Sequence, residues 1–133
     1  MKHVEEARIA LWADAAELCP ALLQKLQRLG CRVERVDSLD DLWNLMERDL
    51  DLVVANCQSA TDLLHWMRGV RLASSTPPPV LMLADARDVN VYLKAMTLGA
   101  FDCVAVPIRD EELQRLVQRA VETPRAEPLM LHA

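Results

Sequence analysis

The sequence predicts a doubly wound α/β domain, in which a five-stranded parallel sheet is covered by helices on both faces. Short runs rich in β-branched residues alternate with longer stretches whose apolar residues recur at helical spacing. Five such alternations are typical of consecutive βαβ units. The expected strands are Arg8–Trp12, Cys31–Val36, Leu50–Ala55, Val80–Leu83 and Cys103–Val106.

The composition of three strands predicts their places in the sheet. Leu50–Ala55 and Val80–Leu83 are almost wholly apolar, as expected for central strands that are buried on both faces. Cys31–Val36 alternates apolar and charged residues, which indicates an edge strand with one solvated face.

The first helix carries an apolar stripe that stops at Gly30, a residue suited to a helix C-terminus. Its start is open, because Pro20 either kinks a helix capped at Asp14 or is itself the first helical residue. The other helices are expected to begin at capping or acidic residues. These starts are Ser38 with Asp41, Ser59 or Thr61, Asp88, and Asp110 with Glu111 and Glu112.

Residues 1–122 are expected to form one domain, and residues 123–133 a linker or flexible tail, since helical periodicity is lost after Thr123-Pro124. The apolar fraction of 52% argues against disorder, yet no apolar run is long enough to span a membrane. The first residues do not resemble a secretory leader, so we expect a cytoplasmic protein.

The net charge and the spacing of the cysteines argue against nucleic-acid binding and against disulfides or a zinc site. The net charge is −5 and no basic cluster is present, which disfavours direct nucleic-acid binding. The four cysteines are scattered without a CxxC pair, so reduced thiols are expected rather than disulfides or a zinc site. They are Cys19, Cys31, Cys57 and Cys103.

The segment Ala95–Ile108 contains the run Gly99-Ala100-Phe101-Asp102-Cys103 and ends in Val106-Pro107-Ile108. It resembles the receiver domain of bacterial response regulators, and most closely the receivers of NtrC-type enhancer-binding activators. Those commonly carry Gly-Ala-Phe-Asp-Tyr there, followed by Lys-Pro. The resemblance extends over roughly residues 8–122. It implies the CheY-like, flavodoxin-like strand order 2-1-3-4-5.

Receivers transfer phosphate, with the help of magnesium, onto an aspartate at the end of the third strand. The resemblance places an amide there, and an amide is a poor nucleophile and a poor magnesium ligand. Other functional positions also lack the family's groups. The acceptor position is Asn56, the paired acids are Ala13 and Asp14, the hydroxyl position is Ala84, the lysine position is Val106, and the aromatic switch position is Cys103.

Two further features concern the same region. Pro107 is retained, and the family precedent implies a cis Val106-Pro107 bond. The loop after Asn56 is shorter than the common pattern by about four residues. Together the substitutions predict lost phosphotransfer, with no metal, no cofactor and no enzymatic activity, because such sites depend on joint electrostatics.

Several residues have two readings. Asn56 either mimics a neutralised aspartate or is an ordinary strand-end residue that satisfies local backbone groups. Asp14 is either a vestigial metal ligand or a helix cap. Asp85 is either a displaced phosphate acceptor or a solvated loop residue.

Cys57 and Cys103 could form a redox sensor, although most such cysteines are small buried hydrophobes. His65 has no second ligand at helical spacing and is expected at the surface or its boundary. Trp66 is expected to pack, with an interface role as the alternative.

The face built from the fourth helix, the fifth strand and the fifth helix is the expected partner surface, as it is in receivers. The alternative is an ordinary solvated face of mixed charge. Its candidate contact residues are Val91, Lys94, Leu98, Asp102, Arg115, Gln118 and Arg119.

We therefore expect a pseudo-receiver that regulates transcription or signalling through protein contacts, including homodimerisation, without phosphorylation. It could be the regulatory part of a longer transcriptional activator or a free-standing adaptor. Two other functions stay open. One is a phosphoacceptor with an unusual site, and the other is a small-molecule sensor that binds at the strand ends.

Overall fold

The computed structural model describes residues 4–13, 18–56, 65, 67–70, 76–85 and 89–122. Its sheet has five parallel strands in the order β2-β1-β3-β4-β5, which confirms the predicted fold and strand order. The strands are β1 (Arg8–Ala13), β2 (Arg32–Arg35), β3 (Leu52–Asn56), β4 (Val80–Asp85) and β5 (Asp102–Val106).

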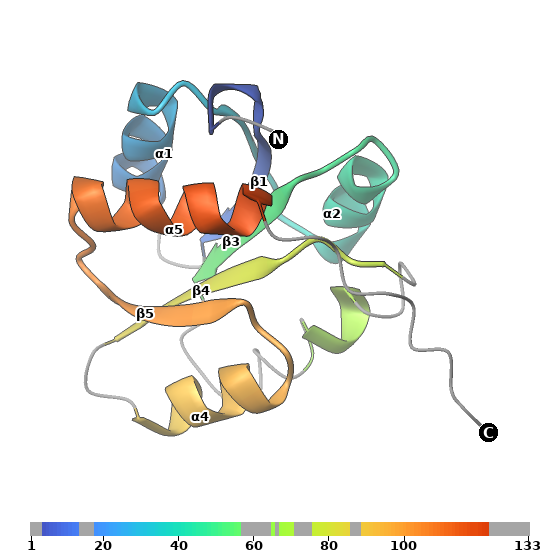
Figure 1. Ribbon diagram of the computed structural model, residues 1–133. Coiled ribbons are helices and arrows are strands. Elements are labelled where there is room, and N and C mark those ends of the chain that lie inside the picture. Colours follow the sequence, from blue (N-terminus) through green and yellow to red (C-terminus); the bar gives the residue numbers. More distant parts are fainter. Residues whose placement is uncertain are drawn as a thin grey trace.

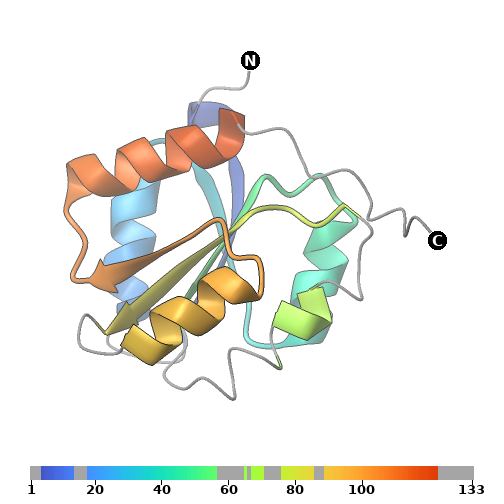
Figure 2. The same cartoon turned by 60° about the horizontal axis from the view of Figure 1, so that its bottom comes forward.

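Helices cover both faces of this sheet (Figures 1 and 2). One face carries α1 (Leu18–Arg28) and α5 (Asp110–Glu122), and the other carries α2 (Leu39–Met46) and α4 (Val89–Thr97). A short 3-10 helix, η1 (Val4–Glu6), precedes β1, and residues 67–70 are helical on the α2 side.

The period-2 alternation of the central strands divides the core into two halves. Leu52 and Val54 of β3 pack with α1 and α5, whereas Val53 and Ala55 pack with α2 and α4. All five residues of β3 are buried, as predicted for a central strand. β2 lies at the edge of the sheet and its charged residues are exposed, also as predicted.

The helix ends agree with their capping chemistry. The Ser38 hydroxyl accepts a hydrogen bond from the Asp41 backbone N–H at 3.2 Å, which caps α2. Gly30 follows α1 with a φ of 88°, a left-handed conformation that glycine adopts without strain. Pro20 is not the first residue of α1, because the helix already includes Leu18 and Cys19. The alternative cap at Asp14 lies outside the described residues.

Three expectations lie outside the described residues. These are the cap of the third helix at Ser59 or Thr61, the cap of the fourth at Asp88, and the tail 123–133. The domain boundary at residue 122 therefore stays a prediction. Among the described residues, no helix is both long enough and apolar enough to cross a membrane.

Candidate functional site at the ends of the strands

The predicted site positions lie together at the carboxyl ends of the parallel strands. Asn56 is the last residue of β3, where it pairs with Ala13 of β1 on one side and Leu83 of β4 on the other. Ala84 follows Leu83, and Val106 is the last residue of β5. The carboxyl ends of parallel strands are where ligands bind in open α/β sheets, so these positions define a candidate site.

Among the described residues, Asn56 is the one polar residue that is buried, with only 6% of its surface exposed. Its side-chain Nδ2 donates a hydrogen bond to the backbone carbonyl of Leu83 at 3.1 Å. A carboxylate has no N–H to donate, and its oxygen would repel that carbonyl oxygen. The environment of residue 56 is therefore matched to an amide.

The described side chains at the neighbouring strand ends add little polarity. Ala84 is buried, and Val106 is half-buried and packs against the α1–α5 half of the core. Neither side chain can hydrogen bond to an oxyanion or carry a positive charge. Within the described residues, no three His, Cys, Asp or Glu side chains gather in a way that could hold a metal ion. Asp14 and Cys57 lie outside the described residues. Of Ala13 and Asp85 the structure describes the backbone and not the side chain.

A cation reaches this region from a different element. Lys25 of α1 donates from Nζ to the carbonyl oxygen of Ile108, in the loop between β5 and α5. The same Nζ lies 3.6 Å from a carboxylate oxygen of Asp110, and Arg28 lies 3.7 Å from the other. Ile108 is buried and follows the cis peptide bond between Val106 and Pro107. Lys25 thus ties α1 to the start of α5. No sequence pattern indicated this contact, which joins residues 83 positions apart.

Cys103 is buried in the α2–α4 half of the core. Burial, together with the nearby negative charge of Asp102, raises the pKa of its thiol to about 11. Burial likewise raises the pKa of Cys31 to about 11. Both thiols are protonated at neutral pH, which is the opposite of the thiolate that a redox sensor requires. His65 is exposed, as expected, and the side chain of Trp66 lies outside the description.

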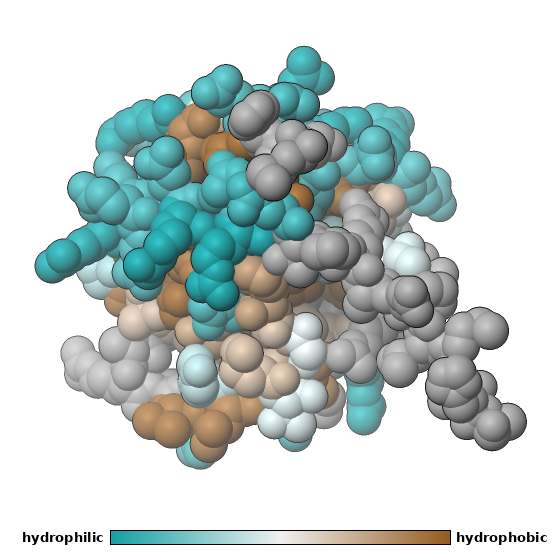
Figure 3. Space-filling view, viewed as in Figure 1, coloured by the Kyte–Doolittle hydropathy of each residue, from teal (hydrophilic) through white to brown (hydrophobic). Residues whose placement is uncertain are grey.

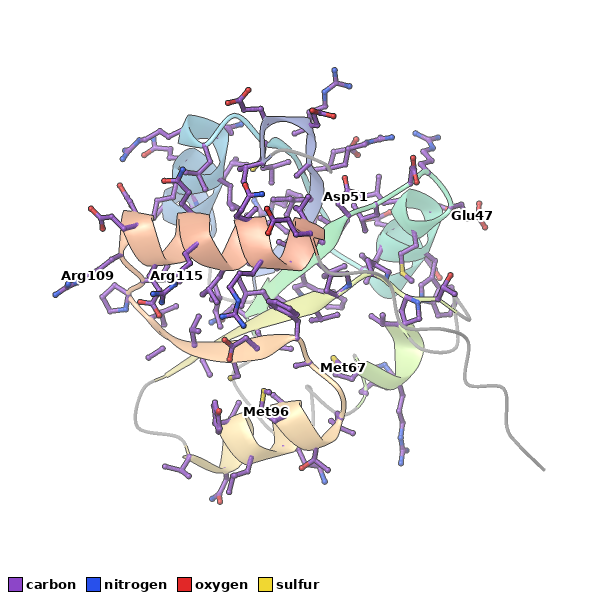
Figure 4. The ribbon with its side chains drawn as sticks, in the orientation of Figure 1. Glu47, Asp51, Met67, Met96, Arg109 and Arg115 are labelled. Atoms are coloured by element: carbon purple, nitrogen blue, oxygen red, sulfur yellow. The ribbon has the colours of Figure 1, made fainter. Side chains whose placement is uncertain are left out.

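The residues of the expected partner surface lie on α4, β5 and α5, at the β5 edge of the sheet; Figure 4 labels Arg115 among them. Arg115 and Arg119 are exposed on α5, and Lys94 is exposed on α4. Arg119 also lies 5.8 Å from the ring centre of Phe101. Asp102 and Gln118 are half-buried; a carboxylate oxygen of Asp102 accepts the Cys103 backbone N–H, and Gln118 donates to Glu122.

Two apolar residues expected on that surface pack toward the core instead. Val91 is only 2% exposed and packs in the core, so the expectation that it forms an interface contact is wrong. Leu98 is half-buried and packs against the same core. Val91 and Ala95 are the buried residues of α4, which places Val91 on the side of the helix that faces the sheet.

The sequence did not indicate that α4 also has an exposed apolar face. It consists of residues at helical spacings of three and four, which share one side of a helix. Their exposed fractions range from 38% to 64%. Hydrophobic surface is visible at the lower edge of the molecule, where Figure 1 places α4 (Figure 3). We call this face the α4 stripe; its members are Val89, Tyr92, Leu93 and Met96.

Comparison with solved structures decides the fold. The receiver domain of a sensor histidine kinase from Pseudomonas aeruginosa PAO1, whose active site cleft coordinates magnesium, aligns with a TM-score of 0.73 at 23% identity. The alignment covers 88% of this chain and 98% of that one. A response regulator receiver protein from Burkholderia phymatum aligns with a TM-score of 0.72 at 22% identity, over 93% and 100% of the two chains. The chain has the fold of a response-regulator receiver domain.

The sequence itself is similar to that of a known regulator. The DNA-binding transcriptional regulator NtrC of Rhizobium meliloti is 30% identical over an alignment of 131 residues, which covers 94% of this chain. The chain spans 26% of the length of that relative. No protein-family model matches the chain. The receiver fold and the likeness to NtrC agree with the resemblance that the residues 95–108 predicted.

Proposed function

We propose that this receiver-like domain is a cytoplasmic, non-enzymatic regulatory module that acts through protein contacts and without phosphorylation. The observation that carries the proposal is the hydrogen bond from Asn56 to Leu83 at the end of β3. In the receiver fold, this strand end is where the acceptor carboxylate would stand. Here an amide fills the position and is held by the neighbouring strand.

Two other features support a domain that needs no phosphate. Val106 offers no cation to an incoming phosphoryl group, and Ala84 offers no hydroxyl. The loop between β5 and α5 is instead held by Lys25, through Ile108 and Asp110. In receivers, a lysine at the end of the fifth strand binds the phosphate. Here the loop that follows this strand is instead bound by a lysine of α1, without any phosphate.

The α4 stripe supports a contact surface, and we propose that a second copy of the chain binds it. The stripe contains four of the five large apolar side chains that are exposed among the described residues. It lies beside β5, an edge strand that carries the acidic side chain of Asp102. Positive charge at the same side of the sheet comes from Lys94 on α4 and from Arg115 and Arg119 on α5. A surface with both apolar and oppositely charged groups can pair with itself about a two-fold axis.

The likeness to NtrC suggests where such a module would operate. We propose that the domain regulates a transcriptional activator, either as part of the same polypeptide or as a separate adaptor. Dimerisation would then bring two output modules together.

Dimerisation can be tested by sedimentation over a wide concentration range, with and without acetyl phosphate and magnesium. We expect a concentration-dependent dimer that the phosphoryl donor leaves unchanged. Leu93→Glu should weaken the dimer at least about tenfold, because it places a charge in an apolar contact. Gln24→Glu adds the same charge to an exposed position of α1 and should have no effect. A strictly monomeric protein, or equal weakening by both variants, would rule out the α4 stripe as the dimer contact.

A further inference from the structure

A pocket lies at the amino ends of the strands, on the opposite side of the sheet from the strand end that carries Asn56. It is about 120 Å³ in volume and opens between the sheet and the end of α2. Figure 4 marks this edge by Asp51, just before β3, and Glu47, just after α2. The pocket is lined by Arg8, Ile9, Arg32, Glu34, Leu45 and Leu50.

Two arginines stand side by side in this pocket. Arg8 of β1 and Arg32 of β2 are direct partners in the parallel ladder. The alternation of β1 and β2 directs both side chains to the α2 face, the face on which Ala10 and Val36 are buried. Like charges on directly paired residues repel each other, so the arrangement destabilises the sheet unless an anion lies between them.

The described residues supply little compensation for these two charges. None of the ion pairs between described side chains involves Arg8 or Arg32. Arg8 donates from Nη1 to the carbonyl of Arg48 at 2.8 Å, a neutral acceptor that leaves its other N–H groups available. Asp51 accepts the backbone N–H of Arg8, not its guanidinium. Glu34 lines the pocket without forming an ion pair with either arginine.

We propose that this pocket binds a small oxyanion of the phosphate class between Arg8 and Arg32. Guanidinium groups present paired N–H donors that match the oxygens of phosphate. The pocket volume corresponds to roughly four waters at about 30 Å³ each. This is enough for a single phosphate group, and well below the pockets of about 300 Å³ or more that hold larger metabolites. The carboxylate of Glu34 opposes the anion and limits the affinity.

Binding can be measured by following backbone amide signals of the full chain in nuclear magnetic resonance while inorganic phosphate replaces chloride at constant ionic strength. We expect saturable shifts at the amides of β1, β2 and the end of α2, with a millimolar dissociation constant. Arg32→Gln should weaken binding about tenfold or more, since it removes one of two charge-assisted contacts. Glu34→Gln should strengthen binding several-fold.

Arg35→Gln is the matched control. Arg35 lies on the same strand, three residues from Arg32, and pairs with Asp37 outside the pocket. It changes the net charge by the same amount and should leave phosphate affinity unchanged. All these side chains are exposed, so the variants are expected to fold, which thermal unfolding checks. Shifts that never saturate, or equal losses in the Arg32 and Arg35 variants, would overturn the site.

Discussion

At the scale of single residues, Asn56 has the most consequential environment in the domain. Replacing it with aspartate would place a carboxylate at a 6%-exposed position and remove the hydrogen bond to Leu83. Desolvation would raise the pKa of that carboxyl above the value of about 3.9 for unfolded aspartate. We expect Asn56→Asp to lower the free energy of unfolding by about 2–4 kcal/mol at pH 7.

The pH dependence of this loss has a definite sign. A carboxyl whose pKa is raised by folding binds its proton more tightly in the folded state. The loss should therefore shrink as the pH falls from the raised pKa toward about 4, and stay constant above the raised pKa. Urea unfolding at several pH values measures it. Asn56→Ala serves as the control, because it loses the hydrogen bond without adding an ionisable group, and its cost should not vary over this pH range.

The buried thiols provide a second residue-scale prediction. With pKa values of about 11, Cys31 and Cys103 are nearly all protonated at pH 8, whereas a free cysteine with a pKa of about 8.5 is partly thiolate. We expect alkylation of both to be at least about a hundredfold slower than that of free cysteine. Peptide mass mapping after timed exposure to iodoacetamide measures this. Fast labelling of Cys103 in the folded protein would revive a redox role.

At the scale of elements, the tie between α1 and the β5–α5 loop depends on Lys25 more than on Arg28. Both side chains lie near Asp110, but only Lys25 also donates to the buried residue Ile108. Exposed ion pairs contribute about 0–1 kcal/mol, while an unsatisfied backbone acceptor costs about 1–3 kcal/mol. Lys25→Met should therefore destabilise the domain by about 1–2 kcal/mol, and Arg28→Met by less than about 0.5 kcal/mol.

Hydrogen exchange can locate that effect. Amides of the β5–α5 loop should exchange faster in the Lys25 variant and be unchanged in the Arg28 variant, since only the first loses the tie to Ile108. Equal exchange in both variants would mean that the loop is held by its own packing.

The elements also show what the sequence could and could not predict. Strand identities and order followed from alternating composition and the resemblance around Gly99, because both are local patterns. The sequence did not predict which side of α4 faces the sheet, because apolar residues lie on several sides of this helix. Val91 is buried against the sheet, whereas Leu93 is exposed. Lys25 was missed because its partner Ile108 is distant in sequence, and the paired arginines were missed because strand register is a tertiary property.

In the whole molecule, the two ends of the parallel strands differ in chemistry. The carboxyl ends of the strands form the carboxyl edge of the sheet, where receivers handle phosphate, and this edge carries Asn56, Ala84 and Val106. The amino ends of the strands carry Arg8 and Arg32. The α4 stripe lies to one side of β5, and the more polar α5 lies to the other. This distribution suits a domain whose output is contact between proteins rather than transfer of a phosphoryl group.

The proposed function requires that the domain works without being phosphorylated. The most direct test is the intact mass of the protein after prolonged incubation with acetyl phosphate and magnesium, with an active receiver treated in parallel. We expect an unchanged mass, because residue 56 is an amide that donates a hydrogen bond to Leu83, and because Ala84 and Val106 offer no hydroxyl and no lysine. A gain of one phosphoryl group, located by fragmentation to any residue at the carboxyl edge of the sheet, would contradict it.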